Sequence, residues 1–406
     1  MNKSKNEVLI KPQYLSGCGL DMHKDKISAY YSDNKGENTH YEEFKTFTID
    51  LRRIVDFLVE KKVEVILMES TGVYWISLYH MLKDAGLHII VANPFHIQQM
   101  PKQKTDKKDA KWLCKLAINN MVKKSVVPNS EQHELREYCR LREKYEQQVT
   151  QCYNRTVKIL ERGNYKLRSV SSSIRTKSCQ LIITSIIEGQ RDPKILAQMC
   201  KGRLRSKIDQ MELALDGKLT DSDIAILRMI KFDLEHLHNQ LQLLESSISA
   251  LIAKHYSIEY ELLQKVSGIG VRTSQSILSE AGNDMSKYPS GDHLTAWSGL
   301  APGNNESAGK KKSSSSRKGN KHLKTTMIRV AWSAVRTKNS YWGCVYSKFK
   351  KRMKAQKAIV AIARRMLKLL YKIINEKIEY VEGGIELFNK YQSKAIQYRQ
   401  RLESAQ

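Results

Sequence analysis

The sequence predicts an α/β domain, then long coiled-coil helical arms, then a mostly α-helical basic domain. Strand-like and helix-like segments alternate from residue 16 to 117, and almost purely helical patterns follow Pro128. Between residues 301 and 354, 15 Lys and Arg stand against the single acid Glu306. We therefore expect a polar basic tail at 1–13, an α/β domain at 14–128, a helical region at 129–260, a basic helical domain at 261–380 and a helical tail at 381–406.

Apolar periodicity defines the elements of the first domain. The predicted strands cover residues 16–21, 26–32, 40–47, 63–68 and 87–92. The predicted helices cover residues 51–60, 73–85 and 106–118. A three-stranded meander followed by β-α-β units makes this a mixed sheet.

Two long helical patterns occupy most of residues 129–260. The first runs over 131–163, and the second keeps an a/d rhythm for eight positions: Leu227, Ile230, Leu234, Leu237, Leu241, Leu244, Ile248 and Leu251. An isolated helix would leave this stripe exposed, so we expect a homo-oligomer, a dimer or a tetramer. Residues 165–218 are least informative, with a helix at 179–188.

The last third has a different pattern, rich in Lys, Arg and Ser. A turn at Ser267–Gly270 precedes a predicted helix at 273–281. A Lys/Ser-rich loop is expected at 309–319, and amphipathic helices at 320–336 and 355–377.

The charge of the chain points to nucleic acid. The 69 Lys and Arg exceed the 42 Asp and Glu by 27, and a phosphate backbone is the commonest polyanion that neutralises such an excess. The seven cysteines are widely spaced without a CxxC, which argues against a zinc ribbon or a disulfide framework. No apolar run approaches the roughly 20 residues of a membrane span. We expect a cytoplasmic, nucleoid-associated protein with double-stranded DNA as partner and no membrane.

Four carboxylates occupy positions that suit an RNase H-like nuclease. Asp21 ends the first strand, Glu69 follows the strand at 63–68, and Asp106 and Asp109 lie three apart on one helix face. Two-metal phosphoryl transfer needs such hard oxygen ligands for Mg²⁺ or Mn²⁺. Taken alone, each acid is equally typical of a surface charge or, for Asp106, a helix cap.

These residues belong to a longer ordered set of motifs. The set comprises Gly19 to Asp25, Met68 to Tyr74, Asn93-Pro94, Lys104 to Ala110, Gly268 to Gly270, Trp297 to Pro302, Ser307 to Lys310 and Lys318 to Asn320. With these motifs the chain resembles the DEDD insertion-sequence transposases, which join a RuvC-like domain to a serine-bearing transposase domain. The family includes the bridge-RNA-guided recombinases.

The resemblance implies an RNase H-like (RuvC-like) first domain and a function. Asp21, Glu69, Asp106 and Asp109 would bind the metal, and Ser307 would be the nucleophile that becomes linked to the DNA strand. An RNA encoded by the element would pair with donor and target DNA. From the residues alone, Ser307 is more typical of a polar loop than of a nucleophile. For attack on phosphorus, the charges of Lys310, Lys311 and Lys312 would stabilise the transition state.

The expected nucleic-acid contacts lie on both sides of the helical region. They are Lys102, Lys104, Lys107, Gly268, Gly270, Lys310, Lys311, Lys312, Arg317, Lys318, Lys321 and Lys324. The turn at Gly268–Gly270 resembles the hairpin of helix-hairpin-helix modules, although a plain turn between helices fits equally well. The histidines have no metal-ligand spacing and are interpreted as surface or cap residues.

Three functions remain open from the sequence. The preferred one is a transposase or recombinase with a DEDD site, a serine nucleophile and a guide RNA. A RuvC-like, structure-selective endonuclease would use a metal-activated water and give Ser307 no role. A non-catalytic nucleic-acid-binding protein would need no metal.

Overall fold

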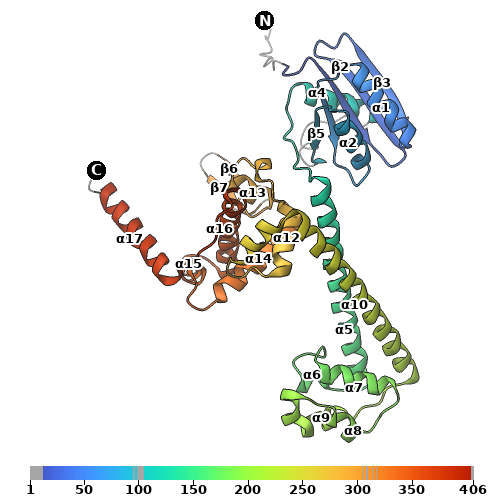
Figure 1. The fold of residues 1–406 in the computed structure, drawn as a ribbon, viewed down its shortest axis with the longest axis vertical. Helices are drawn as coiled ribbons and strands as arrows, with labels where there is room; N and C mark the ends of the chain where they lie inside the picture. Colours follow the sequence, from blue (N-terminus) through green and yellow to red (C-terminus); the bar gives the residue numbers. More distant parts are fainter. Residues whose placement is uncertain are drawn as a thin grey trace. The chain divides into compact units, whose positions relative to one another are not determined.

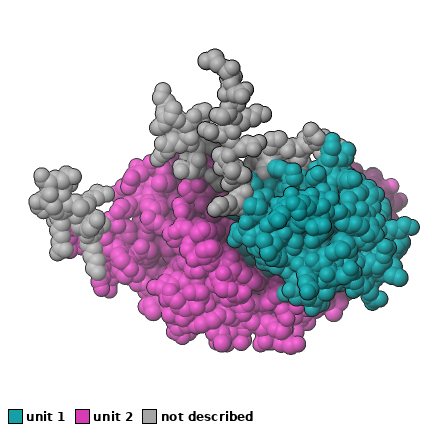
Figure 2. All heavy atoms as spheres, turned by 90° about the horizontal axis from the view of Figure 1, so that it is seen from above, with its two compact units in different colours: residues 1–127 teal, residues 128–406 magenta. Residues whose placement is uncertain are grey.

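The computed structural model describes residues 12–94, 97, 105–303, 305–307, 310–313, 315–316 and 318–403. The chain divides into two compact units, residues 1–127 and 128–406, which Figure 2 shows in two colours. Figure 1 labels the helices and strands of both. No helix in the described ranges is long and apolar enough to span a membrane.

Unit 1 is built on a five-stranded mixed sheet. Its strands are β1 (Ser16–Met22), β2 (Lys26–Asp33), β3 (Thr39–Lys45), β4 (Val65–Glu69) and β5 (Ile89–Ala92), in the order β3-β2-β1-β4-β5. The first three are antiparallel, and β4 and β5 run parallel to β1. The helices are α1 (Thr48–Glu60), α2 (Trp75–Asp84) and α4 (Asp106–Ile118). The predicted mixed α/β sheet is confirmed, and its order is consistent with an RNase H-like domain.

The sheet is covered on both faces. Along β4, Ile66 and Met68 belong to the core cluster that includes the buried residues of α1 and α2. Val65 and Leu67 alternate with them and join the cluster that includes α4. A strand that is buried on both faces has a continuous run of apolar residues, which is the pattern of residues 65–68.

A glycine brings α4 unusually close to β1. A Cβ added at Gly19 would lie 2.1 Å from the carbonyl oxygen of Ala110 and 2.4 Å from the backbone nitrogen of Cys114. Both atoms belong to the backbone of α4, so neither can move as a side chain would. The absent side chain at residue 19 is therefore what allows the helix to lie against the strand.

In its described residues, unit 2 has helices and one short strand pair. Its α-helices are α5 (Ser130–Arg162), α6 (Leu167–Val170), α7 (Lys177–Ile187), α8 (Pro193–Gln198), α9 (Ile208–Ala214), α10 (Asp221–His255), α11 (Ser257–Gln264), α12 (Val271–Ala281), α13 (Gly291–Trp297), α14 (Lys321–Arg336), α15 (Tyr341–Lys350), α16 (Ala355–Glu376) and α17 (Gly384–Glu403). Two 3₁₀ helices cover Gly202–Lys207 and Met285–Lys287.

The long helices α5 and α10 form an antiparallel pair within one chain (Figure 1). Near one end Arg162 pairs with Asp223, and further along Arg142 pairs with Glu245. The start of α10 is fixed by a capping box between Thr220 and Asp223.

The predicted heptad stripe lies largely in the interior of the chain. Leu227, Ile230, Leu234 and Leu237 pack in one cluster with residues of α5 and α7. Toward the end of α10 the last buried position is Ile252 and not Leu251, which is half-buried. The argument that the stripe needs a second chain was therefore wrong, because the same chain covers it.

Residues 165–218, whose sequence pattern is the least informative, fold against one end of the helix pair. Tyr165, Leu167, Ile182 and Leu196 are fully or almost fully buried in the same cluster as α5 and α10. The helix predicted at 179–188 is α7.

The loop predicted at 309–319 contains a strand in its described part. The strands β6 (Asn305–Ser307) and β7 (Lys310–Ser313) pair antiparallel, and an isolated bridge joins Pro302 to Ser316. The Lys/Ser sequence has no apolar alternation, so this pairing rests on backbone hydrogen bonds that leave no pattern in the side chains.

A buried carboxylate joins three helices of unit 2. Glu280 of α12 is 2% exposed and accepts two hydrogen bonds from Arg140 of α5, at 2.8 and 2.9 Å. It also accepts one at 2.6 Å from Asn320, the N-cap of α14. Arg136 donates to the last carbonyls of α12, those of Ser279 and Glu280. The orphan carbonyls of a helix end and a buried charge are thus satisfied together.

Replacing Gly19 with Ala should destabilise unit 1, because the new Cβ meets backbone atoms of α4. We expect a loss of about 2 kcal/mol or more in the free energy of unfolding, measured by urea denaturation. Gly270→Ala is the matched control, since its φ is −108° and no atom lies within 4 Å of the added Cβ. A Gly19→Ala variant as stable as the control would show that α4 does not depend on this glycine.

Replacing Glu280 with Ala should cost about 3–5 kcal/mol at neutral pH, because Arg136 and Arg140 lose a buried counter-charge. Burial alone would raise the pKa of Glu280, but Arg140, Arg136 and Asn320 outweigh it and the pKa is lowered. Its stabilisation is then present above the unfolded pKa, about 4.3, and is lost as pH falls through the lower folded pKa.

Urea denaturation of wild type and Glu280→Ala between pH 7 and pH 3 measures this difference. The control Glu376→Gln removes a carboxylate from an exposed pair with Lys372 and should change stability by less than about 0.5 kcal/mol. Equal effects of the two substitutions at pH 7 would contradict the role of Glu280.

Candidate metal and nucleic-acid site

Two of the four predicted carboxylates stand at the carboxyl ends of two neighbouring strands of the sheet. The parallel register of β1 and β4 pairs Leu20 with Met68, so the residues that follow, Asp21 and Glu69, stand at the carboxyl ends of neighbouring strands. Glu69 accepts a hydrogen bond of 2.7 Å from the hydroxyl of Thr71. The polar side chains at these carboxyl ends can therefore contribute to a common site.

The helix α4 carries the other two, Asp106 and Asp109, in its first turn. Its N-cap is Thr105, whose hydroxyl accepts from the backbone nitrogen of Lys108 at 3.3 Å. Asp106 is therefore not the cap, and its carboxylate instead forms an ion pair of 2.7 Å with Lys26 of β2. The close approach of α4 at Gly19 holds this first turn beside the end of β1.

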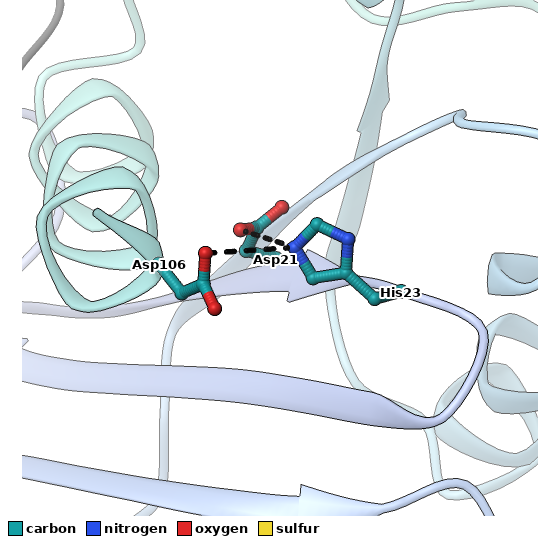
Figure 3. A group of neighbouring side chains, drawn as sticks. All are labelled: Asp21, His23 and Asp106. Carbon is teal, nitrogen blue, oxygen red and sulfur yellow. Dashed lines mark hydrogen bonds and ion pairs between the residues drawn. The ribbon is translucent and has the colours of Figure 1, made fainter. Parts of the chain in front are cut away.

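A histidine joins the acids of β1 and α4 (Figure 3). The Nε2 atom of His23 lies 3.2 Å from Oδ2 of Asp21 and 3.9 Å from Oδ1 of Asp106. One ligand atom from each of the three residues falls within 4.8 Å of the others, a spacing that suits a metal ion. His23 is a surface residue, as predicted, but it lies between two of the predicted carboxylates.

The carboxylates influence one another electrostatically. The pKa of Asp21 is raised by burial; His23 lowers it, while the charges of Asp109 and Glu69 raise it further. The hydrogen bond from Lys26 lowers the pKa of Asp106. The side chain of Asp21 is 14% exposed. The charges of Asp109 and Glu69 act on it directly, and it shares His23 with Asp106.

This donor set fits a divalent cation. Asp21, His23 and Asp106 bring two carboxylates and one imidazole within reach of one ion. Carboxylate oxygens are the ligands that Mg²⁺ and Mn²⁺ prefer. A bound cation would offset the charges of Asp109 and Glu69, which add to the effect of burial in raising the pKa of Asp21.

Sequence reasoning missed His23 and Lys26. Both lie at the tight turn between β1 and β2, where the backbone nitrogen of His23 donates to the carbonyl of Lys26. The signal available was their distance from Asp21, two and five residues along a predicted hairpin. Both side chains lie close to Asp106. This contact depends on the packing of α4, which is distant in the sequence.

The other predicted residues are spread over both units. Lys107 lies over the ring of Tyr41, 5.1 Å from its centroid. Lys324 donates to the hydroxyl of Ser316 at 2.8 Å, and Lys318 and Lys321 are exposed. Ser307 pairs with Lys310, and Glu306 with Lys311, in the register of β6 and β7; these residues and Lys312 are described by backbone alone. Lys102, Lys104 and Arg317 lie outside the described residues.

The two glycines of the predicted hairpin differ. Gly268 has φ +88°, and a Cβ there would lie 2.8 Å from the carbonyl oxygen of Val330 in α14. Its glycine is explained by packing within unit 2. Gly270 has open space around it, so it is the one of the two that leaves its backbone accessible.

Comparison with solved structures finds two of RuvC from Thermus thermophilus. One is a complex with a Holliday junction substrate, at 11% identity and a TM-score of 0.22; the match spans 25% of this chain and 90% of that one. The other has 11% identity and a TM-score of 0.20, with 24% and 90% covered. No curated protein matches the sequence.

Two protein-family models match the chain in the order found here. A DEDD transposase model of the IS110 type matches residues 18–164, which include all four carboxylates. The transposase model of the IS116/IS110/IS902 family matches residues 260–347, which include Ser307. Together they cover more than half of the chain. The protein therefore belongs to the IS110-type DEDD transposases, enzymes that cleave and recombine DNA.

Proposed function

We propose that this transposase cleaves and exchanges DNA strands with a carboxylate-bound metal site in unit 1 and a serine nucleophile in unit 2. Asp21, Glu69, Asp106 and Asp109 hold Mg²⁺ or Mn²⁺, and Ser307 attacks the scissile phosphate. The observation that carries the proposal is the environment of Asp21, a largely buried carboxyl group beside further acids from β4 and α4.

The residues of unit 1 prepare this site for an anionic substrate. Bound divalent cations would polarise the phosphate and neutralise the charge that develops on its oxygens. The hydrogen bond from Lys26 lowers the pKa of Asp106, so this carboxyl group stays ionised to lower pH. The ionised form is the one that binds a cation. The carboxylates are held by rigid elements, because β4 packs with β1 in one core cluster and with α4 in another.

Ser307 is the residue assigned to nucleophilic attack. Its hydroxyl oxygen forms a bond to phosphorus, the bond from phosphorus to one DNA oxygen breaks, and that oxygen takes up a proton. The strand pairing of β6 and β7 supports this assignment, because it sets Ser307 opposite Lys310 in backbone register and close to two further lysines. Positive charge beside the phosphate favours the transition state.

The partners in this proposal are double-stranded DNA and a guide RNA. Between residues 307 and 375 the sequence contains 20 Lys and Arg and no Asp or Glu. Such a stretch neutralises phosphates of either nucleic acid. Synapsis of two DNA ends further calls for a homo-oligomer, a dimer or a tetramer, formed through a surface other than the stripe of α10.

Substituting the carboxylates should separate cleavage from binding. In Asp21→Asn and Glu69→Gln, strand cleavage should fall by about 100-fold or more, while DNA affinity stays within a few-fold, because the charge change affects the cation and not the basic domain. Mn²⁺ binding, measured by electron paramagnetic resonance, should weaken in parallel.

The matched control is Glu42→Gln on β3, whose half-buried carboxylate pairs with Arg53 and His40 and not with His23 or Lys26. It should retain both Mn²⁺ binding and cleavage. Cleavage that continues in EDTA would contradict the metal-dependent proposal.

Substituting Ser307 tests the nucleophile. A serine that attacks phosphorus leaves protein linked to one DNA end, whereas water leaves none. With a suicide substrate nicked near the cleavage site, denaturing electrophoresis should show an adduct for the wild type and none for Ser307→Ala.

Replacing Ser313 to Ser316 together by Ala is the control and should keep the adduct. Ser307→Ala that still cuts at the wild-type rate would favour the alternative, an endonuclease that uses water. That alternative has its own support, because all four carboxylates lie within unit 1.

A further inference from the structure

Two neighbouring cavities open beside α15 and α17, helices that pack against each other in unit 2 (Figure 1). The larger has a volume of about 720 Å³. It is lined by the end of α14, the turn between α14 and α15, and residues of α15 and α17. The smaller, of about 220 Å³, lies between α15, α16 and α17. They share Lys348, Phe388 and Gln392, so they form one continuous surface.

The charge of this surface is entirely positive. Its cations are Arg336, Lys338, Lys348, Lys351, Arg352 and Arg365, and none of the residues that line it is acidic. In the part of the chain that the structure describes, none of these six forms an ion pair with a carboxylate. Lys348 instead donates to the side-chain amide oxygen of Gln392.

A second arginine-rich cavity in unit 2 is a useful contrast. It is lined by Arg140, Arg142, Arg272 and Arg329, but each of these is matched by a glutamate from α5, α10 or α12. The arginines of this cavity are therefore paired with carboxylates of the same chain. The cations beside α15 and α17 are left for an external anion.

Aromatic rings line the smaller cavity. Tyr341 lies 6.5 Å from Phe388 and 6.3 Å from Tyr391, between ring centroids, and Arg365 lies 4.6 Å from the ring centroid of Phe349. Tyr391 is 53% exposed, so part of its ring is open to a ligand. The arrangement combines a phosphate-binding groove with a stacking surface.

We propose that these cavities bind an unpaired nucleic-acid strand, with phosphates along the cations of the larger one and a base stacked on Tyr391. Bases within a duplex already stack on each other, so only an unpaired base can offer its face to a ring in a cavity. An acidic peptide would match the charge but would leave the aromatic rings without a planar partner. The individual contacts predicted from the sequence do not include any residue of this site, although its six cations all lie in the basic stretch at 307–375.

Fluorescence anisotropy with labelled 12-nucleotide oligo(U) RNA and oligo(dT) DNA, and with a 12-base-pair duplex, tests the proposal on the full chain. Tyr391→Ala should weaken binding of at least one single strand by about tenfold or more, because it removes a stacking surface, and duplex binding should stay within twofold. Tyr391→Phe keeps the ring and should bind as the wild type does. Which oligonucleotide responds identifies RNA, DNA or both as the source.

The double variant Lys338→Ala with Lys351→Ala tests the groove. Both side chains are exposed, so the fold should tolerate the changes. The slope of log K against log salt for the single strand should fall by about 1.4, the value for two lost phosphate contacts. The charge-matched control, Lys194→Ala with Lys254→Ala, should leave the slope unchanged.

A Tyr391→Ala variant that binds both single strands like the wild type, or that weakens duplex and single strands equally, would overturn the proposal. The inference rests on the proposed function only in taking nucleic acid as the partner. Binding is measured in EDTA, so the result does not depend on whether the carboxylates or Ser307 cleave DNA.

Discussion

The candidate metal site depends on how closely α4 lies against β1. Asp21 is fixed by the sheet, while Asp106 and Asp109 come from a helix that follows more than 80 residues later in the chain. Their distance is set where the backbone of α4 touches Gly19. Gly19 has no side chain and no charge, yet it controls the electrostatics of the site, because it sets how closely Asp106 and Asp109 approach Asp21.

Much of the fold follows from local patterns in the sequence. The strands of unit 1 and the helices α4, α5, α7, α14 and α16 were predicted to within a few residues, since each carries its own apolar period. The carboxylates were proposed as a site because they stand at predicted strand ends and in a predicted first turn. Each of these signals lies within one element.

The features that were missed are those that depend on contacts between elements. The stripe of α10 looked like an oligomer seam because nothing in its own residues tells which helix covers it, and α5 of the same chain does. The pairing of β6 with β7 uses backbone atoms alone. His23 and Lys26 gain their roles from a helix distant in sequence, so their residue types gave no indication.

The helix α5 makes two kinds of contact along its length. Near its start, Gln132, Arg136 and Arg140 hold the end of α12 through directed hydrogen bonds; further on, Val149, Cys152 and Ile159 face the core shared with α7 and α10. Each residue advances a helix by about 100°, so inserting one residue between these sets would turn the second away from its core. The length of this arm can therefore change only by a number of residues that returns both sets close to their original faces, such as a heptad or eleven residues, with a matching change in α10.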